Sequence, residues 1–193
     1  MAVECEDVIP IENLDSCPQD EVVAGISEVG VFGSPIKDFL SIAKPKDLKT
    51  ALTNEELATI AEAHTFKEGK GFHRVDFIPF SGSVDSVQVG EVGSISMENS
   101  LGAAVKGTNA RVAGYMRRYT NVPMLYIIKE KNGDVKQIGS ELSPAYIAEV
   151  GATSGKKPGE AKQTVIKIKD TQAYMAPNYA GTIQEFPAPA PLP

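Results

Sequence analysis

The strongest local structural signal in this chain is the stretch Met124–Ser140, MLYIIKEKNGDVKQIGS. An apolar run comes first, Asn132-Gly133 follows as a turn that requires a positive φ, and a second run returns in the opposite direction. This order is typical of a β-hairpin. The sequence therefore predicts two adjacent antiparallel strands here, to which the rest of the molecule is added.

Strand-like runs on both sides of this hairpin predict a mainly β fold. In TVIKIK, residues 164–169, two isoleucines alternate with Val165 and Lys167. One face of that strand is expected to pack while the other faces water. The remaining predicted strands lie in Glu21–Phe32, where glycines indicate a bulge or bend, in Ser94–Val105 and in Tyr146–Thr153.

One clear helix is predicted at Asn109–Tyr119, with Thr108 as its N-cap. Its apolar stripe consists of Val112, Ala113, Met116 and Tyr119. Its other side consists of Arg111, Gly114 and Arg118. Because glycine carries no side chain, a neighbour can approach that side closely.

The segment before the glycine turn at residues 69–71 allows two interpretations. A capping-box pattern at Thr53 and Glu56 predicts a helix. Alternatively, Ala58–Lys67 matches a strand that pairs with Phe72–Phe80 as a hairpin. We expect a short helical turn near Asn54–Thr59, followed by that hairpin.

The composition is that of a soluble, folded chain with one core. Hydrophobic residues make up 42% and charged residues 23% of 193, while 17 Gly, 13 Pro and the absence of Trp favour many short elements. The predicted class is mainly β (α+β), a β-sandwich with one flanking helix. We divide the chain into an extended acidic N-terminal arm (1–20), a sandwich domain (21–183) and a Pro/Ala-rich tail (184–193).

The charge distribution is asymmetric. Between Met1 and Ile36 there are eight acidic residues and no Lys or Arg, and the whole chain carries a net charge of −6. This balance argues against binding nucleic acid by charge neutralisation. No apolar run reaches the length of a membrane span and no secretory signal is expected, so we predict no membrane insertion.

The sequence contains few residues in patterns typical of catalysis or metal binding. Two histidines, His64 and His73, have no neighbouring nucleophile, and Cys5 and Cys17 lie far from them, so no zinc spacing exists. The segment Gly151–Lys157 is one residue short of a phosphate-binding loop. We therefore expect no enzyme activity, no metal and no cofactor. The alternative is a small hydrolase or ligand-binding sandwich that uses His73 and a nearby acid.

Four stretches follow one another in a recognisable order: TFKEGKGF (Thr65–Phe72), SVQVGEVGSISMENS (Ser86–Ser100), KGTNARVAGYMRR (Lys106–Arg118) and LYIIKEKNGDVKQIGS (Leu125–Ser140). This arrangement resembles the phage major tail tube protein family, over about residues 53–183. Members of that family form hexameric rings that stack into a tube, through which DNA is ejected. The resemblance implies a structural virion protein of the tail, made in the host cytoplasm, whose partners are its own copies, other tail proteins and transiently passing DNA.

The resemblance also implies roles for particular residues. The helix 109–119 becomes the flanking helix, with Arg111, Gly114 and Arg118 on its free side. The glycine-rich loop at residues 82–93 becomes the loop that contacts the neighbouring subunit. Its candidate contact residues are Gly82, Asp85, Gln88, Gly90, Glu91 and Gly93. The hairpin turn becomes a candidate tube rim, through Glu130, Asn132, Gly133 and Asp134. The alternative in the same class is another ring-forming injection-tube or head-decorating virion protein.

Overall fold

The computed structural model describes Leu14 and residues 23–186. The acidic arm except Leu14, both cysteines and residues 187–193 lie outside the described part. In chain order the elements are β1 (Ile26–Pro35), the 3-10 helix η1 (Ile36–Asp38), β2 (Phe39–Ser41), α1 (Asn54–Ala58), β3 (Thr59–Ile60), β4 (Thr65–Phe66), β5 (His73–Val75), β6 (Ser83–Val89), β7 (Ser96–Lys106), α2 (Ala110–Tyr119), β8 (Met124–Glu130), β9 (Val135–Ile138), β10 (Tyr146–Thr153), β11 (Gln163–Gln172) and β12 (Asn178–Tyr179).

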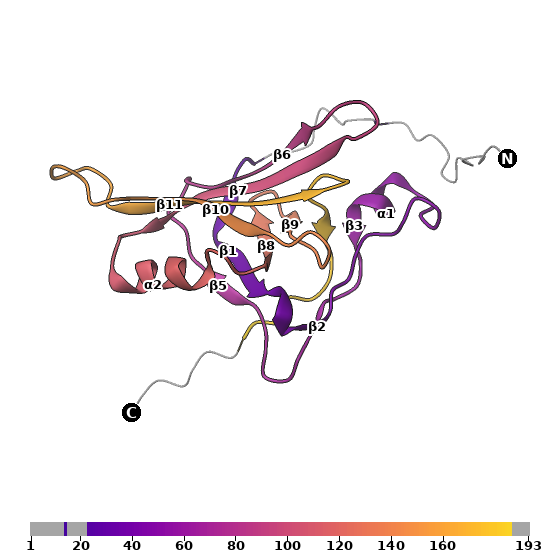
Figure 1. The fold of residues 1–193 in the computed structure, drawn as a ribbon, viewed down its shortest axis with the longest axis horizontal. Helices are drawn as coiled ribbons and strands as arrows, with labels where there is room; N and C mark the ends of the chain where they lie inside the picture. Colours follow the sequence, from indigo (N-terminus) through magenta and orange to yellow (C-terminus); the bar gives the residue numbers. More distant parts are fainter. Residues whose placement is uncertain (1–13, 15–22, 187–193) are drawn as a thin grey trace.

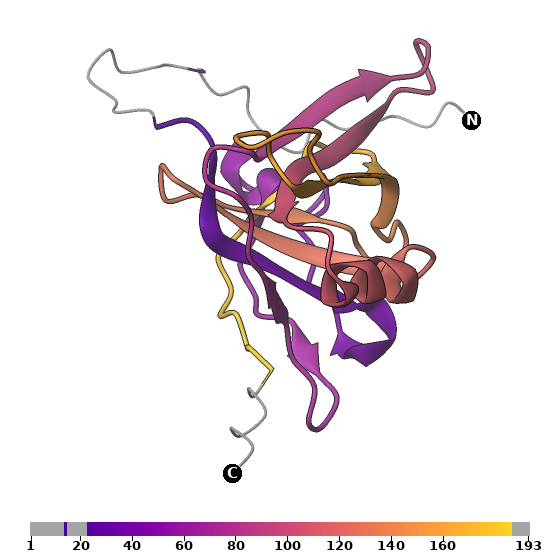
Figure 2. The ribbon, with the colours of Figure 1, turned by 90° about the vertical axis from the view of Figure 1, so that its left-hand side faces the viewer.

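Two sheets stack as the layers of a sandwich, which confirms the predicted mainly β class (Figure 1). One is six-stranded, in the order β3-β12-β9-β8-β1-β5, and the other is four-stranded and antiparallel, in the order β10-β11-β7-β6. A small sheet pairs β2 with β4. The helix α2 flanks the sandwich, and Figure 2 shows the β6–β7 hairpin projecting beyond its body.

The apolar strand β8 lies at the centre of the six-stranded sheet and is buried on both faces. Met124, Tyr126 and Ile128 point into the core between the two sheets. Leu125 and Ile127 point to the opposite face, where a second core contains three phenylalanines and Tyr179. Because both faces of the strand are covered, consecutive side chains all have to be apolar. Burying one such side chain stabilises a fold by about 1.5–3 kcal/mol.

The turn between β8 and β9 differs from the expected two-residue turn. Only Gly133 has a positive φ, at 100°. Gly133 N–H donates to Glu130 O at 3.2 Å, and Glu130 N–H donates to Asp134 O at 2.7 Å. These bonds define a three-residue loop that closes with a glycine bulge. Asn132 stabilises it through its side chain, whose carbonyl accepts from Asp134 N–H at 3.1 Å.

The four-stranded sheet follows the predicted alternation. Ile166 and Ile168 are each 1% exposed in the core, while Val165 is 46% exposed on the other face. Next to them a buried carboxylate, Asp170, accepts from Gly139 N–H, from Asn99 Nδ2 at 2.9 Å and from Gln172 Nε2 at 2.6 Å. Burial raises the pKa of Asp170, and these hydrogen bonds partly offset the effect.

The hairpin expected from Ala58–Lys67 and Phe72–Phe80 is wrong. The helical turn before it is present as α1, and Thr53 caps it by accepting from Glu56 N–H at 3.3 Å. However, β4 pairs with β2, and β5 pairs with β1. Each partner strand precedes the strand it pairs with by more than 20 residues, so β4 and β5 are satisfied by long-range pairing instead of by each other.

The helix α2 is found one residue shorter than expected. Its N-cap is Asn109, whose side chain accepts from Val112 N–H at 3.1 Å, so the expected cap at Thr108 is wrong. Tyr115 takes the place expected for Ala113 in the apolar stripe, because it packs against the core together with Val112, Met116 and Tyr119. The residues of this stripe are still three or four positions apart, as expected for one face of a helix.

The first residues of the predicted tail belong to the fold. Phe72 N–H donates to Gln184 O at 2.9 Å, and Phe186 N–H donates to Phe72 O at 2.8 Å. Residues 184–186 therefore run alongside Phe72 as a parallel bridge. The ordered chain continues at least three residues beyond the boundary predicted at residue 183.

Candidate assembly surface

Strand β6 is one edge of the four-stranded sheet. It pairs with β7 from Ser83 opposite Gly102 to Val89 opposite Ser96. Within the described part of the chain its other side has no strand partner. A strand of seven residues thus presents one row of backbone N–H and C=O groups that is free to pair with another chain.

Strand β10 is the opposite edge. It pairs with β11 alone among the described strands, and a bulge between Ile147 and Glu149 leaves Glu149–Thr153 as its regular part. All three pairings within the sheet are antiparallel, so β6 and β10 run in opposite directions. If β10 of a second copy lay beside β6, the antiparallel order would continue without interruption.

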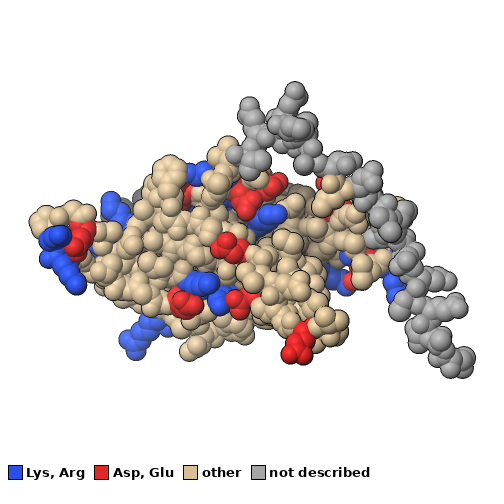
Figure 3. Space-filling view, turned by 90° about the horizontal axis from the view of Figure 1, so that it is seen from above, with Lys and Arg blue, Asp and Glu red and all other residues tan. Residues whose placement is uncertain are grey.

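The outer face of this sheet is balanced in charge. Lys169 Nζ lies 2.9 Å from Glu98 Oε1, and this hydrogen bond raises the pKa of Lys169. Lys167 stands opposite Glu149 on the neighbouring strand. In Figure 3, which views the molecule from above this sheet, acidic and basic groups lie interspersed in a largely uncharged surface. A shallow hollow of about 490 Å³ lies over Gly102 and Gly151.

The segment expected to be a loop is mostly strand. Asp85 and Gln88 lie within β6, where Asp85 accepts from Ser83 Oγ at 2.9 Å. Only Gly90, Glu91 and Gly93 lie in the connecting turn, which Ser94 N–H closes by donating to Glu91 O at 2.8 Å. Gly82 precedes the strand, and a Cβ there would overlap the end of the Ile26 side chain. The ordering comes from β7 of the same chain, so a partner is not required for it.

The predicted residues of α2 lie on its exposed side. A Cβ at Gly114 would meet no atom within 4 Å outside its own helix, so this position is open. Arg118 lies over the ring of Tyr119, with 5.6 Å between the guanidinium carbon and the ring centroid. Arg111 lines a hollow of about 330 Å³ together with Arg74 and Lys106.

The predicted rim turn is exposed at Asn132, Gly133 and Asp134 and half-buried at Glu130. Burial raises the pKa of Glu130, and the positive charge of Lys136 opposes this shift. The turn therefore projects from one end of β8 and is not enclosed within the sandwich.

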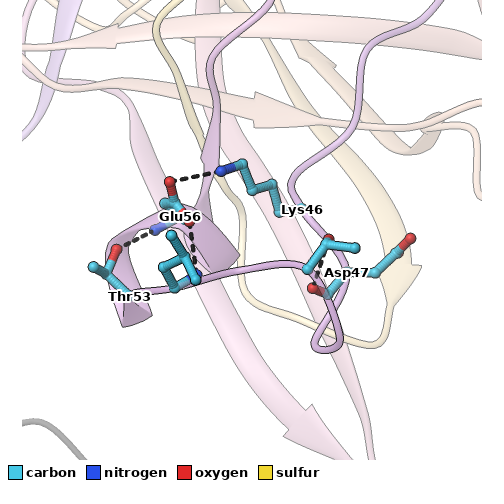
Figure 4. Close-up of polar contacts among 6 residues, drawn as sticks. Lys46, Asp47, Thr53 and Glu56 are labelled. Atoms are coloured by element: carbon cyan, nitrogen blue, oxygen red, sulfur yellow. Dashed lines mark hydrogen bonds and ion pairs between the residues drawn. The ribbon is translucent and has the colours of Figure 1, made fainter. Parts of the chain in front are cut away.

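A separate hollow of about 730 Å³ lies between the loop of residues 42–53 and α1. Figure 4 shows the polar contacts of Glu56 at this place. Glu56 holds this loop, because its carboxylate accepts from Lys46 Nζ at 2.7 Å and from Leu52 N–H at 2.8 Å. The bond from Lys46 is the main cause of a lowered pKa at Glu56. Both bonds join α1 to the loop, so they fix the shape of the loop.

Two further observations concern chemistry and membranes. The exposed His73 packs on the ring of Phe186, 4.7 Å between centroids, and has no hydrogen bond or ion pair to a carboxylate in residues 23–186. The described residues contain no group of three or more His, Cys, Asp and Glu side chains placed to hold a metal ion. They also contain no helix with the length and apolarity needed to cross a bilayer.

Sequence reasoning predicted the strand β10 but treated the segment that contains β6 as a loop, and it placed neither at a sheet edge, because edge position depends on long-range pairing. Comparison of the chain with protein-family models, curated proteins and solved structures gave no match.

Proposed function

We propose that this chain is the subunit of a phage tail tube, which assembles as stacked hexameric rings and forms the conduit for DNA ejection. The proposal rests on the resemblance of its sequence stretches to tail tube proteins and on one structural observation. That observation is the pair of free, oppositely directed edge strands, β6 and β10, at the two ends of one sheet.

Free edges of this kind favour self-assembly. Pairing β6 of one copy with β10 of the next uses two different surfaces, which is a head-to-tail contact. Such a contact closes into a ring when the rotation between copies divides a full turn. Closure would satisfy every exposed ladder group on both edges and would join the four-stranded sheets into one continuous barrel.

The outer face of the four-stranded sheet suits the inside of such a barrel. A wall of unpaired Lys and Arg would bind the phosphates of DNA and slow its passage. Here Lys169 is paired with Glu98, and Lys167 faces Glu149 across the strands. Both bases are therefore matched by acids on the surface that we assign to the lumen.

Electron microscopy and sedimentation of the purified protein over a wide concentration range test this function. We expect rings and tubes that increase with concentration, with six-fold symmetry in end-on views. Persistent monodisperse monomers at high concentration would contradict the proposal. Rings of another symmetry that do not stack would instead favour the alternative, a different ring-forming injection-tube or head-decorating protein.

A further inference from the structure

Phe80 lies in a conformation that its residue type disfavours. Pro79 and Phe80 are the central residues of a turn that is closed by Ser81 N–H donating to Ile78 O at 3.2 Å. Phe80 has a φ of 59°, and it is the one residue other than glycine with a positive φ among the described residues. A turn with Pro second and a positive φ third is type II, whose third position favours Gly or Asn. A bulky side chain there is strained.

The turn is fixed firmly in place. Ile78 N–H donates to Ala104 O at 2.8 Å, and Ala104 N–H donates to Ser81 Oγ at 3.2 Å. These bonds tie both ends of the turn to β7. The position of the ring is therefore determined by the sheet and does not depend on the freedom of a loop.

The ring itself is 90% exposed. Lys131 packs on one side of it, with Nζ 4.0 Å from the ring centroid. Lys131 is held in turn by Glu28 at 2.8 Å. A solvent-exposed aromatic ring whose backbone is held in place is typical of an anchor residue at a protein interface. Nothing in the fold of a single subunit requires a phenylalanine here.

We infer that Phe80 is an aromatic anchor between two copies of this chain, which rests on the proposed ring assembly. Phe80 comes three residues before β6, the edge that pairs with a neighbour in that assembly. Antiparallel pairing with full overlap sets the Ser83 end of β6 beside the Thr153 end of β10. Phe80 then lies level with the loop of residues 154–162 in the neighbouring copy.

That loop offers a suitable partner for an aromatic ring. It contains Lys156 and Lys157, which are exposed, and lysines pack their alkyl stems and ammonium groups on ring faces. Phe80 already holds Lys131 in this way on one side. The inferred contact repeats the same chemistry across the subunit boundary.

Phe80→Gly tests this inference, because glycine relieves the strained φ while removing the ring. We expect a melting temperature close to that of the wild type and a critical concentration for ring formation at least about tenfold higher. Leu142→Ala is the matched control, since Leu142 is 96% exposed but lies away from β6 in sequence and pairing, and it should assemble like the wild type. Phe80→Asn, which also tolerates a positive φ, is a second variant if the glycine variant folds poorly.

The outcomes separate the two proposals. If the wild type forms rings and Phe80→Gly forms them equally well, the anchor is refuted while the tube function stands. If both Phe80 variants fail to fold, the ring is part of the subunit's own structure and the inference is refuted. If the wild type forms no rings at any concentration, both proposals fail.

Discussion

At the scale of single residues, His64 shows how the second core fixes a protonation state. Ala43 N–H donates to His64 Nδ1 at 3.0 Å, so the proton of the neutral ring lies on Nε2, which donates to Gln137 Oε1 at 2.8 Å. The imidazole also stacks on Tyr179 with 4.6 Å between centroids. Burial lowers the pKa of His64 from 6.5, and the bond to Gln137 opposes the shift only in part.

This arrangement predicts a pH-dependent stability. Because the folded pKa is below the unfolded one, the contribution of neutral His64 is present above about pH 6.5 and is lost as the pH falls through the folded pKa. We expect the free energy of unfolding, measured by urea denaturation, to be lower at pH 5.5 than at pH 7.5 by up to about 1 kcal/mol. His64→Gln should remove this difference, while His73→Gln, at an exposed position, should keep it. An identical decrease in His64→Gln would contradict the assignment.

At the scale of elements, edge strand β6 can be tested without disturbing the core. Val87 and Gln88 are adjacent and exposed, and successive N–H groups along a strand point in opposite directions. Replacing each by proline in turn removes one donor toward β7 and one donor toward the free side. We expect one of the two variants to be clearly less stable and the other to keep its stability but to lose assembly. Thermal melts and sedimentation velocity measure the two effects.

The opposite result would be informative as well. If the proline variant that retains its stability still forms rings, β6 does not pair with a neighbour and the edge-to-edge contact is wrong. A matched substitution, Leu48→Pro, lies outside both edge strands, at the exposed second position of the turn closed by Thr50 N–H donating to Asp47 O, where proline is favoured. It should leave the stability and the assembly unchanged.

Elements that depend on neighbours in sequence were predictable, and those that depend on distant partners were not. The β8–β9 hairpin and α2 each carry their signals within about 17 residues, in a turn glycine or a cap and an apolar stripe. By contrast, β5 pairs with Gly33 and its neighbours about 40 residues earlier, and no local pattern indicates that partner. The same limit hid the edge positions of β6 and β10. Phe80 had a weak local signal, the preceding proline, but its positive φ is visible only in the structure.

At the scale of the whole molecule, charge is distributed in two ways. Acidic residues are concentrated before Ile36, whereas the residues after it contain 17 acidic and 19 basic groups by difference from the totals of 25 and 19. On the outer face of the four-stranded sheet the two lysines are matched by acids within the subunit. In the proposed conduit these acids neutralise the lysines within each copy, so no neighbouring copy is needed to supply them.

If the four-stranded sheets line the proposed conduit, removing those acids should make its inner surface bind DNA. In the double variant Glu98→Gln/Glu149→Gln, Lys167 and Lys169 lose their matched charges, and in the proposed six-fold ring this change is repeated in every copy. We expect assembled tubes of the variant to bind short duplex DNA at least about tenfold more tightly than wild-type tubes at 50 mM salt, and to lose most of this gain at 200 mM salt. Fluorescence anisotropy with labelled DNA measures both affinities. Glu55→Gln/Glu62→Gln, which makes the same charge change beside the hollow at α1, is the control. An equal gain in affinity in that control would mean that the total charge, and not the charges on the outer face of the sheet, determines the affinity for DNA.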